Sequence, residues 1–118
     1  MENRVRPLIA LLSSCVLIAA SVVHSEPLPT SVILTLKDHK FSPSVINVPA
    51  GQSIRVELIN RDSTAEELDS EDLHLEKDVA PHGKVIFQIG PLKPGTYSFM
   101  GELHADTALG KIVVDPAR

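Results

Sequence analysis

Apolar and polar residues alternate through most of the chain after residue 30. In the segments 32–37 (VILTLK) and 53–60 (SIRVELIN), every second residue is apolar, which predicts β-strands with one buried face. For the first segment, the buried face is Val32, Leu34 and Leu36. Further strands are predicted within the stretches 41–52, 74–79, 84–90, 96–102 and 111–115.

Proline and glycine separate these strands at regular intervals, as in the turn Pro49-Ala50-Gly51 and at Pro94-Gly95. About seven or eight short strands with such spacing predict an all-β sandwich or barrel. The stretch 64–76 (TAEELDSEDLHLE) fits either a helical turn or a loop, and no other segment predicts a long helix.

The first 25 residues have the features of a secretory signal peptide. Arg4 and Arg6 precede an apolar run over 8–23, and we predict cleavage after Ser25. An uncleaved membrane anchor is the alternative, although 16 apolar residues are short for a span of about 20. The motif LSSC also resembles the lipidation site of bacterial lipoproteins at Cys15, but the apolar residues after it do not resemble a polar tether. The sequence therefore predicts an exported protein, periplasmic in a Gram-negative cell, with one domain over 26–118.

The composition of the segment 26–118 limits its partners. It has no cysteine, so it contains neither a disulfide nor a thiolate ligand. Nine Lys and Arg stand against fourteen Asp and Glu, a net charge of −5. This charge argues against nucleic acid or anionic lipid as a partner and is compatible with cations. We expect contact with a membrane only through a partner or an uncleaved signal.

The order of elements resembles that of cupredoxins, the Greek-key β-sandwiches that hold blue copper. The resemblance rests on two segments, 41–60 (FSPSVINVPAGQSIRVELIN) and 92–114 (LKPGTYSFMGELHADTALGKIVV). The second keeps the frame that leads to the copper ligands in that family: Pro94, Gly95, Tyr97 and Phe99. The resemblance implies a cupredoxin-like Greek-key β-sandwich.

The ligand positions of the family can be followed along this frame. Residue 101 shares a strand face with Phe99, so Gly101 stands in the position of the copper-binding cysteine. His104 has the spacing of the histidine ligand, and Ala108 replaces the methionine. The remaining histidine is expected near Glu66. Three of the four ligands of blue copper are missing, which excludes that type of site.

Other metal-binding side chains remain near these positions. Our candidate ligands are Glu66, Glu67, Glu102, His104 and Met100. One imidazole with several carboxylates suits iron, manganese or Cu(II) better than Cu(I). We therefore expect a copper or iron ion, without a catalytic residue that can be assigned.

The acidic stretch and the segment after it also resemble the EfeO-type cupredoxin-like family of bacterial ferrous-iron permease systems. The matching residues are Glu66, Glu67, Ser70, Glu76, Lys77, Gly101, Glu102 and His104. The sequence departs from the family pattern at Leu68 and Asp69. The resemblance implies a periplasmic protein that assists Fe(II) oxidation, or delivers iron, together with an iron permease or other uptake components.

Two other functions compete with this one. The missing cysteine and methionine also fit a metal-free interaction module that has the cupredoxin fold. A periplasmic copper carrier is the third function, against which a single methionine in 26–118 argues. Much of the acidic run between residues 62 and 78 fits a solvated loop. His39, His74 and His82 lie in or beside predicted turns, and of these His74 is a possible alternative ligand.

Overall fold

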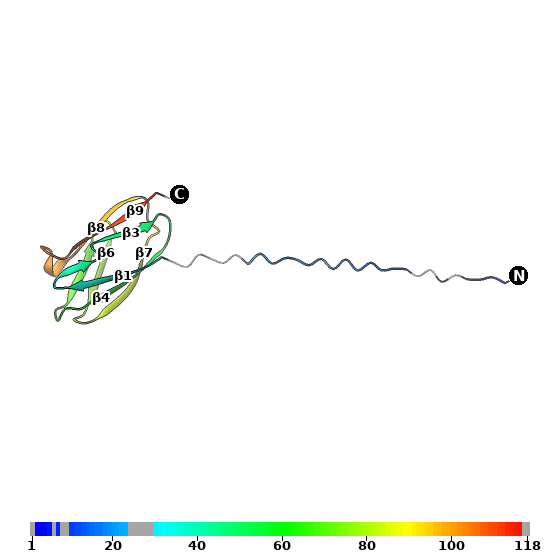
Figure 1. The fold of residues 1–118 in the computed structure, drawn as a ribbon, viewed down its shortest axis with the longest axis horizontal. Helices are drawn as coiled ribbons and strands as arrows, with labels where there is room; N and C mark the ends of the chain where they lie inside the picture. The colour runs from blue at the N-terminus through cyan, green and yellow to red at the C-terminus, as the bar shows by residue number, and fades with distance from the viewer. Residues whose placement is uncertain (1, 6, 8–9, 24–29, 117–118) are drawn as a thin grey trace.

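The computed structural model describes residues 2–5, 7, 10–23 and 30–116. Within 30–116 the chain forms nine strands in two packed sheets (Figure 1). The first sheet has the order β2-β1-β4-β7, with the bounds Lys40–Ser42 (β2), Thr30–Lys37 (β1), Ile54–Asn60 (β4) and Lys84–Ile89 (β7). The second has the order β3-β9-β8-β5-β6, with the bounds Val45–Pro49 (β3), Leu109–Asp115 (β9), Gly95–Gly101 (β8), Glu66–Ser70 (β5) and Leu75–Val79 (β6).

Both sheets are mixed. β1 runs parallel to β4, and β3 runs parallel to β9, whereas the other neighbours are antiparallel. The predicted all-β sandwich is confirmed. All the strands expected from alternation are present, and the stretch 41–52 contains two of them, β2 and β3.

The stretch 64–76 differs from both interpretations of its sequence, because it contains strand β5 and the turn that leads to β6. In β5, Glu66, Leu68 and Ser70 are buried while the residues between them are partly exposed. Two of the three buried residues are polar, so the strand lacks the apolar alternation by which its neighbours are recognised. The Ser70 hydroxyl is satisfied inside the sandwich, since it donates to the Ser98 carbonyl at 2.7 Å.

Apolar residues from both sheets fill the space between them. The core includes Leu34, Leu36, Ile46, Val56, Leu58, Leu68, Ile112 and Val114. The rings of Phe41 and Phe99 meet edge to face, with centroids 5.2 Å apart. Gly110 makes room for Phe99, because a Cβ at Gly110 would lie 2.2 Å from the ring carbon Cζ.

One end of the sandwich collects four connections: the β1–β2 turn, the β4–β5 loop, the β6–β7 turn and the β8–β9 loop. The last contains a short 3-10 turn, η1 (Glu102–His104), in the orange part of the ribbon in Figure 1. The buried side chain of Asn60 ties two of the connections together. Its amide nitrogen donates to the carbonyls of Thr64 (2.8 Å) and Ala80 (3.1 Å). These hydrogen bonds hold the two connections together at this end of the sandwich, which is hereafter called the loop end.

The described part of the N-terminal segment, residues 2–5, 7 and 10–23, contains neither helix nor strand. In the described residues there is no helix with the length and hydrophobicity needed to cross a bilayer. The predicted cleavage point after Ser25 lies outside the described residues, and the signal peptide stays a prediction.

Candidate functional site

A buried carboxylate lies at the centre of the loop end. Glu66 is 2% exposed, and its Oε2 atom lies 2.6 Å from Nδ1 of His104. Its other oxygen accepts hydrogen bonds from the backbone N–H groups of Glu67 (3.0 Å) and Leu103 (2.9 Å). Both oxygens of a buried charge therefore have partners, as burial of a carboxylate requires. These bonds connect β5 to η1 and fix the orientation of the His104 ring.

Gly101 explains how a glutamate fits there. A Cβ atom at residue 101 would lie 2.6 Å from Cδ of Glu66 and 2.8 Å from both its Oε2 and the Cβ of Ala108. The Glu66 carboxylate thus occupies the space into which a side chain at residue 101 would project. Ala108 is fully buried beside it. The small residue at the expected cysteine position, Gly101, therefore leaves room for the Glu66 carboxylate.

A second imidazole lies against His104. The ring centroids of His39 and His104 are 3.6 Å apart, and the ring planes differ by 13°. His39 comes from the turn between β1 and β2, where Asp38 and His39 both have positive φ angles, 51° and 57°. The stack therefore joins the first sheet to the β8–β9 loop of the second.

Asp62 holds this turn in place. Its carboxylate accepts hydrogen bonds from the backbone N–H groups of Asp38 (2.7 Å) and His39 (3.0 Å). The Nδ1 atom of His39 lies 3.5 Å from Oδ2 of Asp62 and has no hydrogen-bond partner among the described residues. Desolvation opposes ionisation of Asp62, but the two backbone hydrogen bonds and the nearby imidazoles outweigh it, so the pKa of this carboxyl lies below its ordinary value.

The five residues predicted from the sequence separate into two groups. Glu66 and His104 touch each other, as described above. Glu67 follows Glu66 in β5 and lies on the opposite, outer face of the second sheet, and Met100 lies on the same outer face, 40% exposed. Glu102 is exposed in η1. In the part of the chain that the structure describes, no group of three or more His, Cys, Asp or Glu side chains is arranged to hold a metal ion. The role of all five as ligands stays a prediction.

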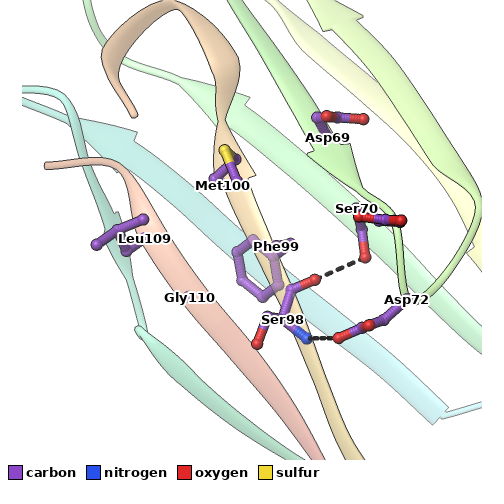
Figure 2. Close-up of a pocket in the computed structure, with 9 residues that line it drawn as sticks. Asp69, Ser70, Asp72, Ser98, Phe99, Met100, Leu109 and Gly110 are labelled. Atoms are coloured by element: carbon purple, nitrogen blue, oxygen red, sulfur yellow. Dashed lines mark hydrogen bonds between the residues drawn. The ribbon is translucent and has the colours of Figure 1, made fainter. Parts of the chain in front are cut away.

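The outer face of the second sheet is acidic. Glu67 lies opposite Asp78, and Asp69 lies opposite Glu76. Desolvation and then the surrounding carboxylates, with Glu102 first among them, raise the pKa of Glu67. Figure 2 shows an open pocket on this face, which Asp69, Met100 and Leu109 help to line. In the wall of this pocket, the backbone N–H of Ser98 donates to Asp72 at 2.8 Å. This surface concentrates negative charge away from the two imidazoles.

With this geometry established, comparison with known proteins becomes informative. Residues 8–114 match the family described as Cupredoxin-like domain. The chain belongs to the cupredoxin-like domain family. It is also 48% identical over 84 residues to the "Uncharacterized protein RP394" of Rickettsia prowazekii (strain Madrid E), a match that spans 71% of this chain and 67% of that protein.

Solved structures share the fold of this cupredoxin-like protein. Auracyanin A, a "blue" copper protein from Chloroflexus aurantiacus, superposes with a TM-score of 0.64 at 14% identity, over 74% of this chain and 99% of that one. A chain in the structure of a heme-copper terminal oxidase dimer gives a TM-score of 0.62 at 17% identity, over 73% of this chain. This chain spans only 65% of the length of that oxidase chain. At these identities, the likeness establishes the fold alone.

The loop end does not fit the copper site of a blue copper protein. The thiolate position is Gly101, and the space beside it is filled by the carboxylate of Glu66. The donors present there, two imidazoles and two carboxylates, are of the types that Cu(II), Zn(II) or Fe(II) accept, but in the described residues they are not arranged around one ion.

Two residues of this cluster, His39 and Asp62, are absent from the predicted ligands. His39 was assigned only to a turn, because nothing in a single sequence shows that the β1–β2 turn lies over the β8–β9 loop. The sequence does hold one indication that His39 is unusual. Asp-His forms the short connection between two segments of alternating apolar residues, where hairpins favour Asn-Gly or Asp-Gly.

Proposed function

We propose that this cupredoxin-like protein is an exported metal-binding protein that holds one Cu(II) or Fe(II) ion at the loop end through His104. The observation that supports this most is the Glu66–His104 contact at 2.6 Å. If Nδ1–H of a neutral His104 donates to Glu66, the lone pair of Nε2 is left for a cation. A carboxylate that hydrogen-bonds one nitrogen of a histidine and so orients the other for a metal is a common arrangement in metalloproteins.

In this proposal, the residues of the chain have separate tasks. His104 binds the ion, with its ring 26% exposed and so accessible from solvent. Glu66, 1% exposed in its side chain, orients the ring and contributes negative charge. If copper is bound, it would supply a one-electron redox couple, in which Cu(II) would become Cu(I) as one substrate Fe(II) became Fe(III). The acidic outer face around Glu67 raises the local concentration of cations.

We further propose that the protein works in the periplasm beside a ferrous-iron permease. The support is the resemblance of the segments around Glu66 and His104 to the EfeO-type family, together with the acidic charge of the domain. A test is the rate of radioactive iron uptake by cells that express the permease with wild-type protein or with His104→Ala. Equal rates with both proteins contradict the role in uptake.

The metal-binding proposal is tested by anaerobic calorimetric titration of the metal-stripped protein with Cu(II) and, separately, Fe(II). The variants are His104→Ala and, as a control, His82→Ala, an exposed histidine in the β6–β7 turn. We expect one-to-one binding that is lost in His104→Ala and retained in His82→Ala. Absence of binding, or binding with equal affinity in all three proteins, refutes the proposal.

One observation favours a second function, a metal-free interaction module. Both oxygens of Glu66 already have partners within the protein. A carboxylate satisfied in this way stabilises the fold without an ion. Failure of the titration to detect any cation would leave this function as the better one.

A further inference from the structure

The outer face of the first sheet carries positive charge, in contrast to that of the second. Side chains alternate between the two faces of a strand, so every second residue of β1, β2, β4 and β7 points away from the core. These outward residues include four cations and one carboxylate, a net charge of +3: Lys37, Lys40, Arg55, Lys84 and Glu57. This surface is hereafter called the basic face.

The acidic outer face of the second sheet carries the opposite charge. The outward residues of its strands include five carboxylates and one cation, a net charge of −4: Glu67, Asp69, Glu76, Asp78, Asp115 and Lys111. The two broad surfaces of the sandwich therefore differ by seven elementary charges, from +3 to −4. A domain charged in this way is complementary to a second copy of itself.

Both surfaces also expose large apolar side chains. Of the six such residues within 30–116, five lie on these two surfaces: Ile33 and Ile86 on the basic face, and Val45, Met100 and Leu109 on the acidic outer face. They are grouped, since Ile33 and Ile86 lie on either side of the same β4 residue, and Met100 is the cross-strand partner of Leu109. Exposed apolar side chains that are grouped and rimmed by polar residues indicate an interaction surface.

We propose that the acidic outer face of one copy packs against the basic face of a second copy of this chain. Opposite charges meet in this arrangement, whereas contact between two identical faces would oppose like charges. The contact also removes the exposed aliphatic side chains of both faces from water. Because the two surfaces differ, each copy keeps one face free, and association continues into short chains.

This inference goes beyond the proposed function and does not depend on it. The contact uses the broad faces of the sandwich, so the loop end stays open and the His104 ring keeps its access to solvent. Four strands about 4.8 Å apart, with about six residues each at 3.3 Å, cover about 400 Å². A standard interface buries about 800 Å² per partner, so we expect weak association, detectable at about 0.1–1 mM protein.

The test is sedimentation velocity of the metal-stripped protein at about 0.01–1 mM, in low salt and in about 0.5 M salt, which screens the charges. The two variants are Lys37→Glu on the basic face and Asp69→Lys on the acidic outer face. Each removes a like-charge pair, since Lys37 lies opposite Lys40 and Asp69 lies opposite Glu76, so the fold should be kept. The control is Lys93→Glu, an exposed residue of the β7–β8 loop with the same change of charge as Lys37→Glu.

We expect the mean mass of the wild type and of Lys93→Glu to rise with concentration in low salt only. Each of the other two variants alone should associate about tenfold more weakly, a loss of about 1.4 kcal/mol. In an equal mixture, the intact acidic outer face of Lys37→Glu meets the intact basic face of Asp69→Lys. The mixture should therefore form dimers and nothing larger.

Several results would overturn the proposal. One is a wild type that stays monomeric at about 1 mM in low salt, where an interface of this size should already be populated. Another is association that neither variant weakens, as expected if the apolar run 8–23 causes it. A mixture that stays monomeric, or an equal loss in Lys93→Glu, would also exclude pairing of these two faces. If the wild type is monomeric but binds anionic vesicles through Lys37, a membrane covers the basic face instead.

Discussion

The close contact between Gly101 and Glu66 leads to a quantitative prediction for Gly101→Ala. The backbone of Gly101 is extended (φ −88°, ψ 112°), so alanine is allowed there, and its lower entropy in the unfolded chain favours folding by about 0.4–1 kcal/mol. Against this, the new methyl group would lie 2.6 Å from the Glu66 carboxyl carbon and 2.8 Å from Ala108 Cβ. Overpacking of this kind costs about 1–3 kcal/mol. We therefore expect a net loss of about 1–2 kcal/mol.

The assay is urea denaturation of wild-type protein, Gly101→Ala, Glu66→Ala and the double variant. A loss of about 1–2 kcal/mol corresponds to a fall in Tm of about 4–16 °C for a domain of this size. In the Glu66→Ala background the carboxylate is gone, and Gly101→Ala should cost less by about 1 kcal/mol. If Gly101→Ala lowers the free energy of unfolding by the same amount, within about 0.5 kcal/mol, in the wild type and in Glu66→Ala, then Glu66 does not fill this space.

Three further predictions concern charges around the site. Glu66→Leu removes the buried partner of two backbone N–H groups and of His104, so it should lower the free energy of unfolding by about 3–5 kcal/mol. Chemical denaturation measures this change, and a loss below about 1 kcal/mol would contradict the prediction. Because the pKa of Asp62 is lowered in the folded state, its carboxylate stabilises the fold above pH 3.8, and this stabilisation is lost as the pH falls through the lower folded-state value. Asp62→Asn should therefore have a lower free energy of unfolding than the wild type at pH 6 and approach the wild type in acid. A difference in free energy of unfolding that stays constant between pH 6 and pH 2 would refute this. The raised pKa of Glu67 reflects an unfavourable charge at neutral pH, so Glu67→Gln should keep or raise the Tm at low salt, with a gain that shrinks as salt is added; a lower Tm would contradict it.

Most of the fold could be predicted because alternation is a local property. In β4, for example, Ile54, Val56 and Leu58 are each almost fully buried, as the pattern predicts. β5 escaped prediction because burial of Glu66 and Ser70 depends on hydrogen bonds to segments more than 25 residues away in the chain. A polar residue in a strand shows no sign of such partners in its own sequence.

The candidate site could be predicted in part for the same reason. His104 and Glu66 follow from the spacing of the frame that the chain shares with cupredoxins. His39 and Asp62 join them only through packing between the two sheets, and His39 and His104, which stack, are 65 residues apart in the chain (104 − 39). Side chains alternate between the two faces of a strand, and Glu66 points inward. Its neighbour Glu67 therefore lies on the outer face.

The measurement that tests the metal-binding account most directly is X-ray diffraction from crystals of the Cu(II)-loaded protein, with data collected on both sides of the copper absorption edge. The account predicts one anomalous difference peak at the loop end, in contact with a ring nitrogen of His104. A peak only on the acidic outer face, near Asp69 and Glu76, would contradict it, as would the absence of any peak in protein saturated with Cu(II).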